Sequence, residues 1–137
     1  MDKYKVILVD DEAEVIDVIE QKIAWNELGF EVVGSATNGV KALELVEKTQ
    51  PDVVITDIKM PIMTGIELAG WIYQNKPDTK VIIVSGYSDF EYARKALEYK
   101  VFDYLLKPIS KDKVSELTAR IKSEIGSKSK MSDDNNT

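Results

Sequence analysis

The chain has 137 residues, 44% of them hydrophobic and 31% charged, which is the size and composition of one ordinary globular domain. It contains no cysteine and no histidine, which excludes disulfides, thiolate metal sites and general-base catalysis by an imidazole. The net charge of −6 argues against nucleic-acid binding by this chain, because such binding draws on cationic contacts to phosphates, whereas oxygen-seeking cations such as Mg²⁺ suit the composition.

Short apolar runs alternate with helical patterns along the chain. In chain order the sequence predicts a strand at Tyr4–Val9, a helix at residues 12–28, a strand at Phe30–Ala36, a helix from Val40 to Pro51, a strand at 52–56, a helix from Thr64 to Pro77, a strand at 80–84, a helix begun at Asp89, a strand at 101–106 and a helix begun at Ser110.

Local signals support these elements. Val15, Ile19 and Ile23 recur about one turn apart on the first helix, and Gly29 suits a left-handed helix end. The residues expected to face the core on the later helices are Val40, Leu43, Val46, Leu68, Ile72, Phe90, Ala93, Leu97, Val114, Leu117, Ile121 and Ile125.

Five strands alternating with five helices predict an α/β domain with a doubly wound parallel sheet, because parallel neighbours need crossover helices. We assign this domain to residues 1–125. Residues 126–137 (GSKSKMSDDNNT) have no apolar periodicity, so we expect a disordered tail, a linker stub or an expression remnant. Because the apolar runs are too short for a bilayer span and no signal peptide is visible, we expect a cytoplasmic protein that does not contact membranes.

Four predicted strands end in polar residues of different kinds. The run VILVDD ends at Asp10 and Asp11, VVITD at Asp57, VIIVS at Ser85 and YLLK at Lys107. The carboxyl ends of parallel strands lie at one edge of the sheet, and ligands bind in the crevice beyond it. We therefore expect three carboxylates, a hydroxyl and an ammonium to converge there.

Each of these features also has an ordinary explanation. An Asp-Asp pair after a strand usually caps a helix, and Asp57 alone could belong to a turn. Ser85 followed by glycine is often a plain turn, and Tyr104 in a strand could simply be half-buried. The motifs favour a shared function because they occur together, in order and at strand ends.

The segments VDDE, VVITDIKMP, VSGYSDFEYA and FDYLLKPI closely resemble the receiver domain of bacterial two-component response regulators. The resemblance covers about residues 3–125, and the wording is most similar to receivers fused to an AraC-type helix-turn-helix domain. It implies a flavodoxin-like sheet with the strand order 2-1-3-4-5. It also implies a signalling switch that catalyses only its own phosphorylation and dephosphorylation, with a sensor histidine kinase as partner and transcription as the output.

The resemblance assigns a phosphoacceptor and a metal site. Asp57 would accept the phosphoryl group, and Asp10, Asp11, Asp57 and the backbone carbonyl of Lys59 would hold Mg²⁺. A carboxylate is a suitable nucleophile for a covalent phosphoryl intermediate, and Mg²⁺ favours oxygen ligands while keeping several waters. Two like charges about 4 Å apart repel by about 4 kcal/mol at an effective dielectric near 20. Without metal, we therefore expect one carboxyl group to have a raised pKa.

Other residues would read the arrival of the phosphoryl group. By the same resemblance, Lys107 would pair with phosphoryl oxygens, Ser85 would donate its hydroxyl to one of them, and Tyr104 would turn inward as the switch aromatic. Pro108, through a cis bond, and Gly86 would set the local geometry. Phosphorylation would alter the face formed by the fourth helix, fifth strand and fifth helix, which could then form a homodimer or bind an output partner.

Two positions tune the lifetime in this family, and two depart from its usual pattern. Lys59 and Tyr87 stand where self-dephosphorylation is tuned, and neither orients an attacking water well, so we expect slow hydrolysis. Lys100 replaces a common glycine, which would cost on the order of 1 kcal/mol if that turn needs a positive φ. Thr64 replaces an aspartate, and both residues are good helix caps.

Three other functional classes fit the sequence less well. A phosphatase with an aspartyl nucleophile and Mg²⁺ would want a second aspartate at the position of Lys59. A nucleotide- or flavin-binding module would want a glycine-rich loop after the first strand, and none is present. A degenerate receiver used only for docking would not need the complete set of site residues found here.

Overall fold

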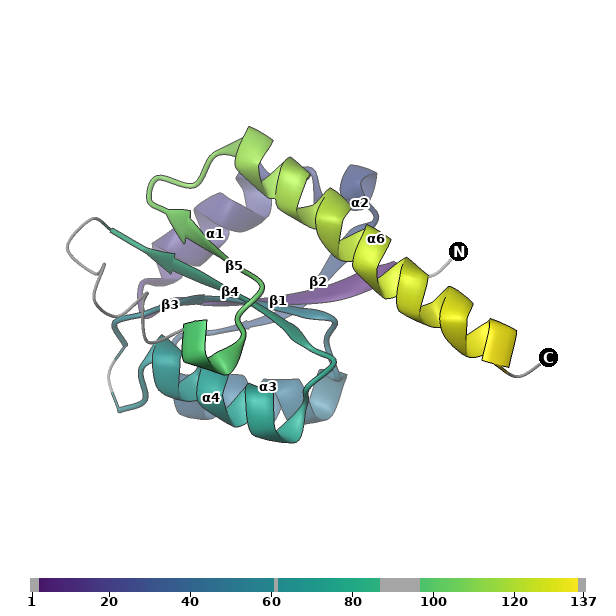
Figure 1. Ribbon diagram of the computed structural model, residues 1–137. Coiled ribbons are helices and arrows are strands. Elements are labelled where there is room, and N and C mark those ends of the chain that lie inside the picture. Colours follow the sequence, from purple (N-terminus) through teal and green to yellow (C-terminus); the bar gives the residue numbers. More distant parts are fainter. Residues whose placement is uncertain (1–2, 61, 87–96, 136–137) are drawn as a thin grey trace.

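The computed structural model describes residues 3–60, 62–86 and 97–135. Its centre is a parallel sheet of five strands in the order β2-β1-β3-β4-β5, as predicted (Figure 1). The strands are β1 (Tyr4–Val9), β2 (Phe30–Ala36), β3 (Val53–Asp57), β4 (Lys80–Ser85) and β5 (Asp103–Leu106). The helical elements are α1 (Ala13–Lys22), α2 (Trp25–Leu28), α3 (Gly39–Thr49), α4 (Gly65–Asn75), η2 (Leu97–Tyr99) and α6 (Lys111–Asn135).

Helices cover both faces of the sheet, with α1 and α6 on one side and α3 and α4 on the other (Figure 1). Successive strand residues point to opposite faces. On β1, Val6 and Leu8 therefore join the core beneath α1, α2 and α6, whereas Ile7 and Val9 join the core beneath α3 and α4. Burial on both faces explains why the strands read as continuous apolar runs.

The helix predicted at residues 12–28 is wrong as a single element. The backbone at Ile23 is extended (φ −95°, ψ 130°), so α1 ends at Lys22 and α2 begins at Trp25. On one continuous helix, Ile23 and Trp25 would lie about 200° apart. The break lets both side chains reach the same core cluster. Gly29 ends α2 with a φ of 87°, in the left-handed region predicted for it.

The buried face of α3 differs from the predicted one. Val40 is 42% exposed, so its predicted inward position is wrong, whereas Val46 is buried as predicted. Gly39 and Ala42 occupy the buried face with Val46, at the i, i+3 and i+7 spacing of one helix side. A Cβ on Gly39 would lie 2.6 Å from the Cβ of Met63, so a small residue is needed there, and an apolar pattern that favours valine over glycine misses this.

Among the described residues, the strands and helices after α3 agree with the predicted elements except at their ends. Ser110 caps α6 by accepting a hydrogen bond from the backbone N–H of Lys113 at 3.2 Å. The helix continues through Gly126 to Asn135, past the predicted domain boundary at residue 125. A glycine inside a helix costs about 1 kcal/mol and does not forbid it. Whether residues 126–137 form a tail remains a prediction.

The helix predicted to begin at Asp89, with Phe90 and Ala93 on its inner side, lies outside the described residues, and so does Tyr87. Leu97 opens the 3₁₀ turn η2. Within the three described segments, no helix combines the length and the apolar character needed to cross a membrane.

Candidate functional site

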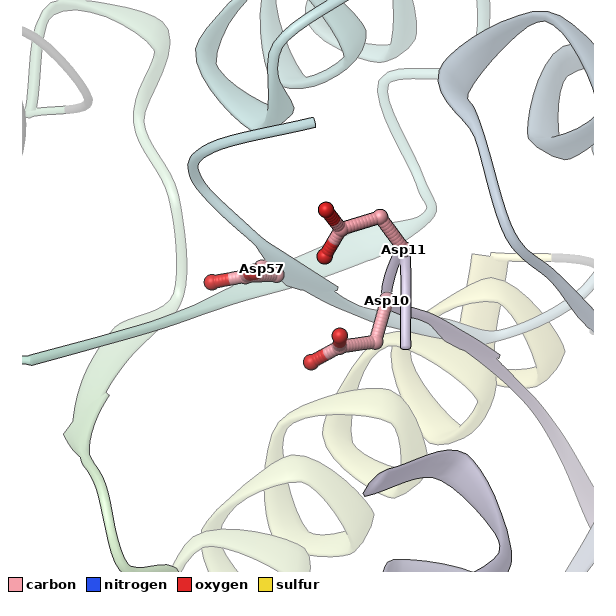
Figure 2. Close-up of side chains that lie close together, drawn as sticks. All are labelled: Asp10, Asp11 and Asp57. Atoms are coloured by element: carbon pink, nitrogen blue, oxygen red, sulfur yellow. The ribbon is translucent and has the colours of Figure 1, made fainter. Parts of the chain in front are cut away.

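Three carboxylates meet at the carboxyl edge of the sheet (Figure 2). Asp10 and Asp11 directly follow β1, and Asp57 ends β3, the neighbouring strand. One carboxylate oxygen from each residue lies within 4.8 Å of the others. Asp10 and Asp57 are 3% and 8% exposed, whereas Asp11 is exposed. The convergence of these side chains, predicted from the strand ends, is confirmed.

The Lys107 ammonium stands opposite the two buried carboxylates. Its Nζ is 3.4 Å from Asp10 Oδ2 and 3.5 Å from Asp57 Oδ1. The backbone N–H of Lys107 donates to the Ser85 carbonyl at 2.9 Å, which ties the loop after β5 to the end of β4. The peptide bond from Lys107 to Pro108 is cis, as the resemblance implies. One ammonium therefore lies between two carboxylates.

Ser85 and Tyr104 form a second polar contact beside the carboxylates. Ser85 ends β4 and is fully buried, and its hydroxyl shares a hydrogen bond with the Tyr104 hydroxyl. Tyr104 lies on β5, in register with Ile83 of β4, and is half-buried. The Ser85 hydroxyl is thus engaged with Tyr104 in this structure, while Lys107 is the group that contacts the carboxylates.

Burial raises the pKa of both Asp10 and Asp57, and the charge of Asp10 raises the pKa of Asp57 further. The Lys107 ammonium and the backbone N–H groups of Glu12 and Ile58 oppose these shifts without cancelling them. Burial would lower the pKa of Lys107, but the charges of Asp57 and Asp10 raise it overall. The direction agrees with the raised pKa expected from like charges, but two carboxyl groups have a raised pKa and burial is the first cause for both.

The loop after Asp57 returns to α4 at very close range. Thr64 and Glu67 form a capping box, in which Thr64 Oγ1 accepts from the Glu67 N–H at 3.1 Å and Glu67 Oε1 accepts from the Thr64 N–H at 3.2 Å. The Gly65 N–H donates to the Ile58 carbonyl at 2.7 Å. A Cβ on Gly65 would lie 2.0 Å from the Asp57 carbonyl oxygen, so only glycine fits without moving the backbone of Asp57.

Gly65 was missed by the sequence reasoning, as was the partner of Thr64 in the capping box. The spacing Thr-x-x-Glu is a recognised helix-start signature and could have revealed Glu67. It carries no sign of the close approach at Gly65. Lys59 lies exposed in the same loop. At Gly86, an added Cβ would meet nothing within 4 Å among the described residues, so crowding does not require glycine there.

An apolar groove adjoins the site. It has a volume of about 300 Å³ and runs between α1 and the loop after β5. Its lining residues are Glu14, Val15, Val18, Ile19, Lys22, Lys107, Pro108 and Ile109. Val18 is 60% exposed. This valine, on the otherwise polar outer side of α1, is the feature of the sequence that could have indicated the groove.

Comparison with known proteins agrees with the family that the sequence resembles. Residues 6–121 match the family model of the response regulator receiver domain. The chain is 39% identical over 122 residues to YesN of Bacillus subtilis, described as an uncharacterized transcriptional regulatory protein, covering 89% of this chain and 33% of YesN. It is 38% identical over 118 residues to the transcriptional regulatory protein HptR of Staphylococcus aureus, covering 86% and 46%. The chain thus spans less than half the length of these curated relatives.

Solved structures agree in fold. The REC domain of AraT, a response regulator from Geobacillus stearothermophilus, superposes with a TM-score of 0.86 at 37% identity, over 92% of this chain and 98% of that one. A two component transcriptional regulator AraC from Clostridium phytofermentans superposes with a TM-score of 0.79 at 34% identity, over 87% and 92%.

Proposed function

This chain belongs to the response regulator receiver domain family, and from that premise we propose that it is a signalling switch that accepts a phosphoryl group on Asp57 from a sensor histidine kinase. The observation that carries the proposal is that Asp57 belongs to the carboxylate cluster and also lies 3.5 Å from the Lys107 ammonium. Phosphoryl transfer is catalysed mainly by positioning and charge neutralisation. The groups around this one carboxylate can supply both.

The carboxylate cluster suits Mg²⁺. Three carboxylates with oxygens within 4.8 Å of one another, two of them with raised pKa, match the hard oxygen ligands that this ion prefers. Asp10, Asp11, Asp57 and the Lys59 carbonyl would hold it. When bound, it would neutralise charge on the carboxylates and on the incoming phosphoryl oxygens.

Asp57 would act as the nucleophile. One of its carboxylate oxygens bonds to phosphorus as the bond from phosphorus to the donor breaks, and the product is an acyl phosphate. The Lys107 ammonium, already 3.5 Å from Asp57 Oδ1, would pair with the phosphoryl oxygens. Its charge stabilises the negative charge that is spread over them during transfer.

The arrival of the phosphoryl group would then change the partners of Ser85. Its hydroxyl, now bonded to Tyr104, would donate to a phosphoryl oxygen, and Tyr104 would turn further inward. We propose that this rearrangement alters the face built by β5, α6 and the helix predicted between β4 and β5. That face would form a homodimer or bind an output partner.

The output is proposed to be transcription, through a DNA-binding domain that is not in this chain. The names of the relatives support this, since YesN and HptR are described as transcriptional regulatory proteins and this chain spans less than half of each. The receiver itself would not contact nucleic acid, in keeping with its net charge of −6, and would act in the cytoplasm.

Lys59 and Tyr87 would make self-dephosphorylation slow. The lifetime of the phosphoryl label on Asp57 measures this rate.

The proposal is tested by labelling the protein with acetyl phosphate and Mg²⁺ and measuring its intact mass. The wild type should gain one phosphoryl group, and Asp57→Asn should gain none, because an amide cannot form the acyl phosphate. Asp52→Asn is the matched control, since Asp52 lies just before the other end of the same strand, and it should label like the wild type. Labelling of Asp57→Asn to the wild-type level would refute the assignment.

A further inference from the structure

Lys22, the last residue of α1, reaches the loop that follows β5. Its Nζ donates a hydrogen bond of 2.6 Å to the carbonyl oxygen of Ile109, a residue 87 positions away in the sequence. Ile109 lies two residues after Lys107, and its side chain is buried in the core. This bond therefore joins α1 to the loop that carries the site lysine.

Besides the buried Ile109 side chain and the ion pairs of Lys107, hydrogen bonds hold the two ends of this loop. Its start is held by the hydrogen bond from the Lys107 N–H to the Ser85 carbonyl at 2.9 Å, and its end is held where Ser110 caps α6. Pro108, in between, has no N–H to donate. The Lys22 ammonium binds the carbonyl between these two points, and a charged donor makes a shorter and stronger bond than a neutral one.

The helix that carries Lys22 also contacts the carboxylate cluster. At its amino end, the backbone N–H of Glu12 donates to Asp10 Oδ1 at 2.9 Å. The ten residues of α1 form a rigid body about 15 Å long. This body touches Asp10 at one end and, through Lys22, holds the Lys107 loop at the other. Each end of α1 thus contacts a segment that carries a residue of the site.

A lysine in the last turn of a helix is commonly explained by the helix dipole. That explanation requires only a positive charge near the end of the helix. It does not require a hydrogen bond to a distant loop, nor a place beside Lys107, Pro108 and Ile109 in the lining of one groove. The contact at Lys22 is therefore more specific than the helix dipole demands.

We propose that Lys22 is a positioning residue, which holds the Ile109 carbonyl so that Lys107 points at Asp10 and Asp57. The inference rests on the proposed function, because it concerns how Lys107 meets the phosphoryl group. Without the Lys22 bond, the loop shifts, the Lys107 ammonium spends less time opposite Asp57, and phosphoryl transfer slows. A misplacement of about 1 Å is enough to slow a reaction that depends on position.

The test compares matched lysine variants. Lys22→Met keeps most of the side-chain stem and removes the ammonium, and it should lower the maximal rate constant of Asp57 labelling by acetyl phosphate about three- to tenfold at saturating Mg²⁺. Lys22→Arg can still donate to the carbonyl and should restore most of the rate. The control is Lys5→Met, because Lys5 Nζ also donates to a backbone carbonyl, that of Thr49 at 3.2 Å, far from the site. It should label at the wild-type rate.

A second readout needs neither metal nor phosphoryl donor. In metal-free protein, Lys22→Met should shift the backbone amide NMR signals of Lys107 and Ile109, and Lys5→Met should leave them in place. The inference is overturned if these signals do not move, or if Lys22→Met labels as fast as the wild type. If the wild type itself did not label, the proposed function would fall, and the NMR signals would still decide whether Lys22 holds the loop.

Discussion

Two aspartates lie at opposite ends of β3, Asp52 just before the strand and Asp57 as its last residue. Asp52, before the strand, accepts a hydrogen bond from the Lys5 N–H at 2.7 Å, while its own N–H and carbonyl bond to the backbones of Lys5 and Lys80 at 2.9 Å each. Asp57, at the end of the strand, is buried beside Asp10 and has a raised pKa. At the amino edge of the sheet, the Asp52 carboxylate accepts a backbone hydrogen bond from the neighbouring strand. At the carboxyl edge, the carboxylates of Asp57 and Asp10 lie close together.

The two aspartates therefore differ in their effect on the stability of the folded protein. A carboxylate that accepts a backbone N–H satisfies a donor that would otherwise need water. A buried carboxylate beside a like charge destabilises the folded protein unless a cation joins it. The free energy of unfolding should therefore respond in opposite directions to the same chemical change at the two edges.

Gly65→Ala should break the carboxyl edge. The added Cβ would meet the Asp57 carbonyl oxygen at 2.0 Å, so we expect a loss of about 3 kcal/mol in the free energy of unfolding together with loss of labelling. Gly70→Ala, on the same helix, is the control. There the Cβ would lie 3.2 Å from the Tyr99 ring, a side chain that can move, so the loss should stay within about 1 kcal/mol. Urea denaturation measures both, and equal stability of the two variants would contradict the close approach.

Asp57→Asn should stabilise the metal-free protein at pH 7, because the neutral amide removes a buried negative charge that lies beside Asp10. Because the folded-state pKa of Asp57 is raised, the fold favours the protonated carboxyl group, and its ionisation destabilises the fold as pH rises above the unfolded value near 3.9. The advantage of asparagine should therefore grow from about pH 4 upward. Thermal melts across pH measure it.

The amino edge supplies the contrast for this measurement. Asp52→Asn should lose about 1 kcal/mol, because it weakens the bond from the Lys5 N–H. Saturating Mg²⁺ should reverse the order of the wild type and Asp57→Asn, since the ion stabilises only a protein that binds it. At ten times its Kd, the gain is about 1.4 kcal/mol. If Asp57→Asn melted below the wild type without metal at pH 7, the crowded-carboxylate picture would be wrong.

Lys100→Gly should give the smallest change, a gain of up to about 1 kcal/mol. Lys100 precedes β5 at the amino edge and has a φ of 50°, so the positive φ that the sequence raised as a possibility is present. Glycine relieves that conformation but loses more entropy on folding, which limits the gain. Labelling should not change. Faster or slower labelling would show that the backbone conformation at the amino edge affects the site.

Much of the fold could be predicted because strands buried on both faces leave a plain signature. The run VVIT ends at Asp57, and at four of the five strands the polar residue at the strand end also belongs to the predicted site. The break between Ile23 and Trp25 could not be predicted, because each residue fits a helix and only the shared core cluster draws both inward. Tertiary packing overrides local periodicity there.

Site residues that act through the backbone are harder to recognise than those that carry the charge. Gly65 matters for the absence of a Cβ near Asp57, and Lys22 matters for a carbonyl 87 positions away. Neither leaves a local pattern. Asp10, Asp11 and Lys107 could be found because their charges stand at strand ends, where topology alone brings them together.

The depth of Asp57 has a consequence for the shape of its donors. Its side chain is 10% exposed, so in the proposed reaction only a donor whose phosphorus projects from its own surface could approach a carboxylate oxygen in line. A phosphorylated histidine that projects from a protein has that reach, and so does a slender molecule such as acetyl phosphate. A phosphoryl group held at the bottom of a cleft has not. If Asp57 accepts the phosphoryl group as proposed, the recess would select donors by their shape before any specific contact forms.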